Sequence, residues 1–160
     1  MSALESVREA LRIDPFQGCQ KYPGKELSLY FKREFLDPET CAALIARIDA
    51  NRRPSTIADA NDDPFNRTSE TCDLFAGDAV VDRVNLALNE LAGIPASHGE
   101  VLQGQRYDVG QEFKLHTDYF EPNGPDYHTY CAVSGQRTWT LMVYLNRPDC
   151  PSSEHSAHLG

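Results

Sequence analysis

The feature that most constrains the fold is a change of hydrophobic period near residue 95. Before this point apolar residues recur at helical spacing, and after it they alternate with polar residues, as they do on a strand. Because the helical segments come first and the strands follow as a block, the chain is expected to be an α+β protein with an antiparallel sheet or barrel.

Two segments carry helix signals at their ends. The stretch "LDPETCAALIARIDANRR" begins with Asp37 as N-cap and Pro38 at the first helical position. A second helix is expected to begin near Asp78 and to end at Gly93, and a shorter one to cover residues 2–12. The residues expected on the buried faces of the two longer helices are Cys41, Leu44, Ile45 and Ile48, and Val81, Val84, Leu88 and Leu91.

The expected strands are short segments rich in aromatic and β-branched residues. They are "ELSLYFKREF" near the start, and "EVLQGQRYDV", "EFKLHTDYF", "YHTYCAV" and "RTWTLMVYLN" after residue 95. In the last segment one face is predicted to be core, with Arg137, Trp139, Leu141, Val143 and Leu145. The other face carries Thr138, Thr140, Met142 and Tyr144, a mixture that suits either a pocket wall or a solvated surface.

Composition narrows the classes of partner. The chain has 160 residues, the length of one domain, and a formal net charge of −9, which repels nucleic acid. A small molecule or a neutral to basic peptide suits this charge better. The five cysteines are an odd set without C-x-x-C spacing, which favours reduced thiols and a cytoplasmic location. No signal peptide or membrane span is expected.

The stretch "KLHTDYF" places His116 two residues before Asp118. On a strand, residues at i and i+2 project from the same face, so an imidazole and a carboxylate would meet there. Completed by a second imidazole, such a pair forms the facial triad that binds Fe(II). The alternative is a solvent-facing strand on which Glu112 and Lys114 share the same face. The tripeptide alone leaves both interpretations open.

The residues around this pair resemble those of a known family. "LQGQRYDVGQEFKLHTDYF" followed by "GQRTWTLMVYLN" is similar to the 2-oxoglutarate and Fe(II)-dependent dioxygenases of the prolyl 4-hydroxylase type. The shared elements are an R-Y-x-x-G-Q-x-F lead-in, an H-x-D-Y-F core and a G-Q-R-T-x-T strand that ends in Y-L-N. Upstream, "FLDPETCAALI" resembles the entry helix of the family and "RTSETCDL" its R-T-S segment. The resemblance covers roughly residues 27–147.

The resemblance implies an oxidoreductase that hydroxylates a C–H bond of a peptide or amino acid while 2-oxoglutarate is decarboxylated to succinate. The implied cofactors are Fe(2+), 2-oxoglutarate as co-substrate, and L-ascorbate, which restores iron oxidised without turnover. The implied site residues are His116 and Asp118 as metal ligands, Tyr107, Thr140 and Tyr144 around 2-oxoglutarate, and Arg67 and Ser69 beside the substrate. For Tyr107 a rim position without a ligand, and for Arg67 and Ser69 a loop held by local hydrogen bonds, are the alternatives.

The fold implied by the resemblance is a set of N-terminal helices packed on an antiparallel double-stranded β-helix, or jelly-roll, core. Residues 1–160 are expected to form a single domain. Within it, a helical support region with early strands reaches to about residue 95, and the first half of the jelly-roll core covers residues 96–147. Residues 148–160 form an atypical tail.

The chain departs from the family pattern after "YLN". The family continues with a glycine-rich segment, a strand bearing a second histidine ligand, and a Lys or Arg that pairs with 2-oxoglutarate, whereas this chain reads "RPDCPSSEHSAHLG". The tail is therefore expected to have no strand, and the jelly roll to be incomplete at its C-terminus. An open sheet edge would then favour self-association. His155 and His158 are the remaining candidates for a third ligand.

Three hypotheses follow. The first is a dioxygenase of the prolyl 4-hydroxylase type, with turnover by this chain itself left open. The second is a truncated, non-catalytic remnant that binds a peptide or partner through the R-T-S segment and a sheet edge. The third is a soluble α+β domain in which the His116 and Asp118 pair is incidental.

Overall fold

The computed structural model describes residues 16–56, 67–124, 127–147 and 155–159, so the expected helix over residues 2–12 lies outside it. The main body is a five-stranded antiparallel sheet in the order β3-β4-β5-β7-β6. Its strands are β3 (Arg53–Pro54), β4 (Glu70–Leu74), β5 (Leu102–Asp108), β6 (Val143–Tyr144) and β7 (His155–Leu159). A separate hairpin pairs β1 (Gln20–Lys21) with β2 (Tyr30–Phe31).

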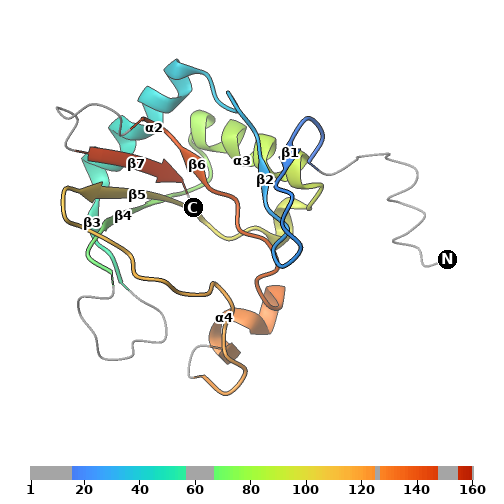
Figure 1. The fold of residues 1–160 in the computed structure, drawn as a ribbon. Helices are drawn as coiled ribbons and strands as arrows, with labels where there is room; N and C mark the ends of the chain where they lie inside the picture. Colours follow the sequence, from blue (N-terminus) through green and yellow to red (C-terminus); the bar gives the residue numbers. More distant parts are fainter. Residues whose placement is uncertain (1–15, 57–66, 125–126, 148–154, 160) are drawn as a thin grey trace.

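The helices of the described residues are α2 (Pro38–Asn51), α3 (Ala79–Ala92), α4 (Tyr127–Ser134) and the short 3-10 helix η1 (Ala96–His98). Figure 1 shows α2 and α3 together on one side of the molecule and α4 at its opposite end. None of the helices in the described part of the chain is long and apolar enough to cross a membrane.

The start signals of α2 and α3 and the end signal of α3 are confirmed. Asp37 caps α2 through a 2.7 Å hydrogen bond to the Thr40 amide, and Asp78 caps α3 through the Val80 amide at 2.9 Å. Gly93 ends α3 in a left-handed conformation with φ of 64°, which glycine adopts without steric cost. Helix α2 therefore begins, and α3 begins and ends, where the sequence signals predict.

The core lies between the helices and one face of the sheet. Its buried residues are Leu44 and Ile48 of α2, Val81, Val84 and Leu88 of α3, Cys72, Leu74 and Leu102 of the sheet, and Leu145. Gly104 of β5 is required here, because a Cβ at this position would overlap the Ile48 side chain. The close approach of α2 to β5 thus depends on the absence of a side chain at residue 104.

The alternate residues of β4 and β5 form the opposite face, away from α2. Thr71 pairs with Gln105 in the ladder, and Ser69 and Tyr107 lie on the same face because side chains alternate along a strand. We call Ser69, Thr71, Gln105 and Tyr107 the polar face of the sheet. This face positions the candidate site described below.

Two predicted strands are wrong. "YHTYCAV" forms helix α4, in which Tyr130 stacks on Phe120 with ring centroids 5.2 Å apart. "EFKLHTDYF" makes only an isolated bridge between Phe113 and Arg67. In the sheet β4 lies on one side of β5 and β7 on the other. The segment "EFKLHTDYF" therefore cannot pair with β5. Tertiary contacts override the β propensity of these residues.

Two other strand predictions hold only in part. Of "ELSLYFKREF" only Tyr30 and Phe31 are paired, and of "RTWTLMVYLN" only Val143 and Tyr144. The predicted alternation is nevertheless present in the second segment, where Leu145 is buried while Met142 and Tyr144 are exposed. Trp139, expected in the core, is 42% exposed and packs beside Phe16 and Tyr30 instead.

The tail prediction is also wrong, because His155–Leu159 form strand β7 between β5 and β6. Backbone hydrogen bonds from both neighbours specify this strand, and such bonds do not depend on the apolar side chains that sequence patterns detect. The sheet ends at β3 and β6, each two residues long. The antiparallel α+β fold is confirmed, whereas the jelly-roll arrangement, its incompleteness and self-association through an edge stay predictions.

Candidate metal centre

His116 and Asp118 lie side by side although their segment is not a strand. The Nε2 atom of His116 is 3.5 Å from Oδ1 of Asp118, and each side chain is a little more than one third exposed. Metal–nitrogen and metal–oxygen bonds are about 2.1 Å long, so two donors of one ion lie up to about 4 Å apart. The separation of Nε2 and Oδ1 falls within this range.

The other polar atom of each side chain is already hydrogen-bonded. His116 Nδ1 lies 2.6 Å from the Lys114 carbonyl oxygen, which can only accept, so Nδ1 donates and carries a proton. Thr140 donates its hydroxyl to Asp118 Oδ2 at 2.5 Å. Neither bond uses Nε2 or Oδ1, the two atoms that lie 3.5 Å apart. Hydrogen bonds of this kind orient metal ligands in proteins.

Phe113 connects this pair to Arg67. The His116 ring stacks on the Phe113 ring with centroids 3.5 Å apart, and the Arg67 guanidinium lies 4.8 Å from the centroid of the same ring. Burial lowers the pKa of Arg67, and the charge of Asp118 is among the weaker effects that oppose this change. A cation and one candidate metal ligand, the His116 imidazole, therefore both contact one aromatic ring.

The Arg67 side chain extends over the polar face of the sheet. It donates hydrogen bonds to Ser69 Oγ at 3.2 Å and to Thr71 Oγ1 at 3.1 Å. The Ser55 hydroxyl also forms a hydrogen bond with the Ser69 hydroxyl, with 2.9 Å between the two Oγ atoms. Ser69 and Thr71 are buried. Burial is the main cause that lowers the pKa of Arg67 from its usual value. The predicted residues Arg67 and Ser69 are thus in direct contact.

Tyr107 belongs to the same cluster. Its hydroxyl lies 3.1 Å from Gln105 Oε1, and a hydrogen bond and charge interaction with Tyr107 act on Arg67. Six predicted site residues are therefore linked through contacts in which Phe113 is the bridge. They are Arg67, Ser69, Tyr107, His116, Asp118 and Thr140.

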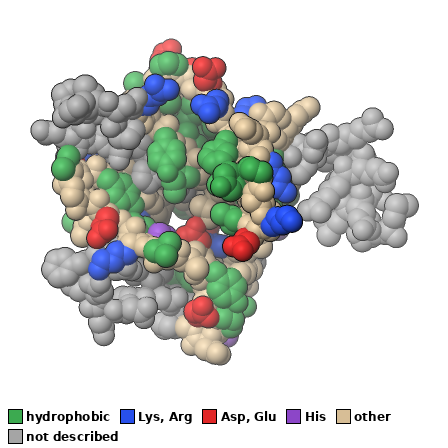
Figure 2. Space-filling model, in the orientation of Figure 1, with side chains coloured by type: hydrophobic (Ala, Val, Ile, Leu, Met, Phe, Trp, Pro, Cys, Tyr) green, Lys and Arg blue, Asp and Glu red, His purple; other side chains and the backbone are tan. Residues whose placement is uncertain are grey.

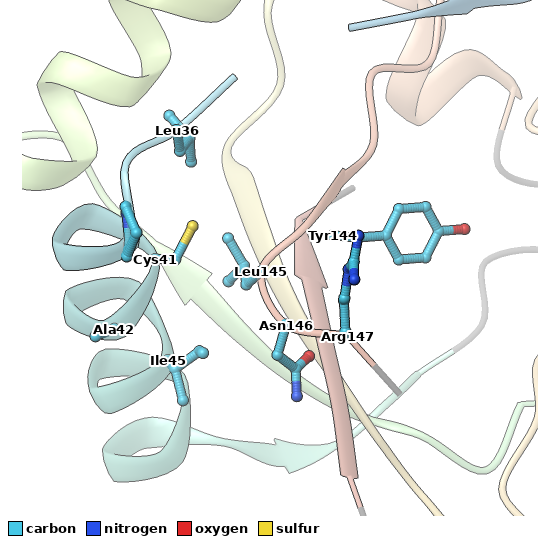
Figure 3. Close-up of a pocket in the computed structure, with 9 residues that line it drawn as sticks. Leu36, Cys41, Ala42, Ile45, Tyr144, Leu145, Asn146 and Arg147 are labelled. Carbon is cyan, nitrogen blue, oxygen red and sulfur yellow. The ribbon is translucent and has the colours of Figure 1, made fainter. Parts of the chain in front are cut away.

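Tyr144, the seventh predicted site residue, lies on β6. It also borders a hollow of about 390 Å³ beside α2, which is lined by Leu36, Pro38, Cys41, Ala42, Ile45, Leu145, Asn146 and Arg147. Figure 3 shows the Tyr144 ring directed away from Leu36, Cys41 and Ile45. The register pairs Tyr144 with residue 158 and residue 158 with Gln105, so Tyr144 lies on the same side of the sheet as the polar face, two strands from Gln105.

Gln136 fixes the segment that carries the candidate ligands. Its side-chain oxygen accepts from the Phe120 amide at 2.9 Å and its nitrogen donates to the Phe120 carbonyl at 2.7 Å, as a neighbouring strand would. Arg137 lies over the Phe120 ring and pairs with Glu100. In this segment the side-chain hydrogen bonds of Gln136 thus take the place of the backbone hydrogen bonds that a neighbouring strand would make.

The described residues contain no group of three or more His, Cys, Asp or Glu side chains able to bind a metal. The two histidines of the tail lie on β7, where the register pairs residue 155 with Asp108 and residue 158 with Gln105. Figure 2 shows histidine and acidic side chains near the centre of the face that it presents.

Sequence reasoning missed three residues that organise this site: Phe113, Thr71 and Gln136. Phe113 and Gln136 lie within the two quoted motifs, in "GQEF" and "GQRT", so their positions were visible, but their roles depend on contacts between segments far apart in the chain. Thr71 follows the R-T-S segment by two residues, a spacing that places it on the same strand face as Ser69.

Comparison with known proteins finds similarity to several prolyl 4-hydroxylases. The chain is 30% identical over 146 residues to a protein of Arabidopsis thaliana named probable prolyl 4-hydroxylase 9, a match that covers 86% of this chain and 48% of the relative. It is 33% identical over 120 residues to prolyl 4-hydroxylase 5 of the same plant, covering 72% of this chain and 40% of the relative.

A shorter match of 69 residues, at 32% identity, joins the chain to the prolyl 4-hydroxylase subunit alpha-1 of Rattus norvegicus. It covers 43% of this chain and 13% of that subunit. No family model matches the chain. The chain spans less than half the length of these curated relatives.

Proposed function

Because this chain is homologous to prolyl 4-hydroxylases over most of its length, we propose that it is a 2-oxoglutarate- and Fe(II)-dependent dioxygenase domain that acts on a peptide or an amino acid. The observation that carries the proposal is the 3.5 Å distance between His116 Nε2 and Asp118 Oδ1. The other polar atom of each side chain, Nδ1 of His116 and Oδ2 of Asp118, makes a separate hydrogen bond.

The residues present fit a divalent ion. A neutral imidazole protonated at Nδ1 presents its lone pair at Nε2, and a carboxylate that accepts a hydrogen bond at Oδ2 keeps Oδ1 for a metal. A mixed nitrogen and oxygen donor set suits Fe(II), with positions left for other ligands. When bound, the iron and 2-oxoglutarate would supply the oxidative chemistry, and succinate and a hydroxylated product would leave.

The chain's own residues have separate roles in this proposal. Thr140 orients the Asp118 carboxylate, and Gln136 fixes the backbone of the segment that carries it. Tyr107 and Tyr144, both on the polar-face side of the sheet, are assigned to 2-oxoglutarate. Arg67, and Ser69 to which it donates a hydrogen bond, are assigned to the peptide side of the site. L-Ascorbate is assigned as the reductant that restores iron oxidised without turnover.

The test measures metal binding and product separately. Titration of the full chain with Mn²⁺ should give a dissociation constant that rises more than about 100-fold in His116→Ala and in Asp118→Ala, because each substitution removes a donor. His128→Ala, on exposed α4, is the matched control and should bind as the wild type does. Succinate release that depends on Fe(II) and 2-oxoglutarate should disappear in the first two variants only.

A second candidate function is a non-catalytic peptide-binding module. It is favoured by the partly exposed Arg67, whose side chain donates to the hydroxyls of Ser69 and Thr71. Equal Mn²⁺ affinity in the wild type and in His116→Ala, together with peptide binding that both proteins retain, would replace the dioxygenase proposal by this one.

A further inference from the structure

We propose that residues 20–33, which contain strands β1 and β2 and which we call the basic hairpin, bind an acidic peptide segment of a partner protein. The binding position is a hollow of about 380 Å³ on this hairpin. Its lining includes three cations and two aromatic rings, from Lys21, Lys32 and Arg33 and from Tyr22 and Phe31. None of these residues belongs to the candidate metal centre, so the inference goes beyond the proposed function and does not depend on it.

The first argument is the charge of the basic hairpin. It carries four exposed cations, Lys21, Lys25, Lys32 and Arg33, in a chain with a net charge of −9. Among the described residues no carboxylate forms an ion pair with any of the four, whereas the arginine of α2 and that of β5 each pair with an aspartate. Figure 1 shows the hairpin at the end of the molecule opposite β3, and Figure 2 shows Lys and Arg side chains there. A cationic patch without counter-charges attracts an anionic partner.

The second argument is the aromatic surface beside these cations. Tyr22 is 52% exposed and Phe31 is 50% exposed. Gln20 pairs with Phe31, and the Tyr22 amide donates to the Leu29 carbonyl at 2.8 Å, so Tyr22 and Phe31 project from the same face of the hairpin. Exposed aromatic rings that share a face are typical of surfaces that bind other proteins. The ligand expected here therefore carries an apolar side chain among its acidic residues.

The third argument is that the opposite face of the hairpin is anchored to the rest of the chain. The Tyr30 ring stacks on the Phe16 ring with centroids 4.6 Å apart, and the Trp139 ring packs beside both, at 4.8 Å from Phe16 and 6.2 Å from Tyr30. The Lys21 ammonium lies 5.7 Å from the centroid of the Tyr30 ring. A binding surface that is held in place before the partner arrives loses less conformational entropy on binding.

The fourth argument concerns the class of partner. Anionic membranes and nucleic acids present many phosphates over a wide surface, and the net charge of −9 opposes a close approach to either. A hollow of about 380 Å³ lies in the range of pockets that enclose a small group of atoms, about 300–1,000 Å³. A few side chains of an extended acidic peptide match both its size and its charge.

The test uses a fluorescein-labelled peptide, Asp-Glu-Phe-Asp-Glu-Leu-Asp-Glu, and its uncharged counterpart Asn-Gln-Phe-Asn-Gln-Leu-Asn-Gln. Binding of each to the full chain would be measured by fluorescence anisotropy without metal, at low and at high salt. The variants are Lys32→Gln, alone and with Arg33→Gln, and Phe31→Thr. The matched controls are Lys25→Gln and Leu27→Thr, because Lys25 and Leu27 are exposed on the same hairpin but do not line the hollow.

The wild type should bind the acidic peptide at least about 10-fold more tightly than the uncharged one, and high salt should reduce this ratio. Lys32→Gln should weaken binding of the acidic peptide about 3- to 5-fold, and the double variant about 10- to 25-fold. Phe31→Thr should weaken it about 5-fold, because the aromatic contact is lost. Each control should change the affinity less than about 1.5-fold. The thermal transition of each variant reports whether it has folded.

Several results would overturn the inference. Equal affinity of the wild type for the two peptides would do so without any variant, and an equal loss in Lys25→Gln and Lys32→Gln would show attraction to the whole hairpin without a defined site. Tighter binding to vesicles of phosphatidylcholine with phosphatidylserine than to the acidic peptide would assign the hairpin to a membrane surface. Self-association in sedimentation that Lys32→Gln abolishes would assign it to a second copy of this chain. The Mn²⁺ titration of the same proteins tests the proposed function separately.

Discussion

At the scale of single residues, the site depends on hydrogen bonds to atoms that face away from the proposed metal. The Lys114 carbonyl fixes which nitrogen of His116 is protonated, and the Thr140 hydroxyl fixes the Asp118 carboxylate. Neither contact was predicted from the sequence, which indicated only that the ligands and Thr140 belong to one site. The contacts explain how an exposed, irregular segment can hold two donors in place.

Thr140→Val tests this residue-scale arrangement. Valine keeps the shape of threonine and removes the hydroxyl, so the Asp118 carboxylate loses its orienting donor, and Mn²⁺ affinity should fall about 10-fold or more. Thr138→Val is the matched control, because Thr138 is exposed on the same segment two residues earlier. Equal affinities in the two variants, measured by metal titration, would show that the Thr140 bond has no role in metal binding.

At the scale of elements, local sequence signals specify the two long helices α2 and α3, and an ion pair then links one helix to the other. Asp78, the N-cap of α3, accepts a hydrogen bond from Arg47 of α2 at 2.8 Å. This bond, followed by the one from the Val80 amide, lowers the pKa of Asp78 below its usual value of 3.8. The cap was predicted from sequence. Its link to α2 was not, because Arg47 is 31 residues away.

Asp78→Asn isolates that charge, since asparagine also caps helices well. A carboxylate whose folded pKa lies below its unfolded value stabilises the folded state above that unfolded value, and the contribution is lost as pH falls through the folded pKa. The variant should therefore melt a few degrees below the wild type at pH 7, and the gap should close as pH falls below about 3.8.

Glu90→Gln is the control for this measurement, because it removes one negative charge from the exposed surface near the other end of the same helix. Thermal unfolding followed by circular dichroism would compare the three proteins across the pH range. A gap between the wild type and Asp78→Asn that persists unchanged at pH 3 would contradict a role for the Asp78 charge.

At the scale of the whole molecule, the arrangement of the sheet depends on strand β7. β7 lies between β5 and β6, and its register with β5 runs from Gly104 and Leu159 to Asp108 and His155. The seven-residue β5 therefore has a partner on each side. Without β7, one long row of β5 amides and carbonyls would face solvent, a condition that favours association between chains.

Deletion of residues 155–160 tests this arrangement by hydrogen exchange. In an antiparallel strand alternate residues direct their amides to opposite neighbours, so the β5 amides that face β7 should lose protection while those that face β4 keep it. The shortened chain should also self-associate at lower concentration. Removal of Gly160 alone is the control, and unchanged protection of all β5 amides in the larger deletion would contradict the position of β7.

The sequence by itself determined the two long helices, strand β5, the antiparallel α+β class and the identity of the residues around His116. These features depend on local signals, namely caps, hydrophobic period and motif, which a short stretch of chain carries alone. Only the tertiary structure decided that "YHTYCAV" is a helix, that the HTDYF segment is irregular and that the polar tail is a strand.

The same division holds within the candidate site. Motif spacing indicated His116, Asp118 and Thr140, but the roles of Phe113 and Gln136 arise from contacts between segments that are distant in the chain. Arg67 is the clearest case, because its sequence context shows a conventional polar loop while its half-buried, hydroxyl-lined position is set by strands β3, β4 and β5 together. Burial and the pairing of charges are properties of the assembled sheet, and no local pattern encodes them.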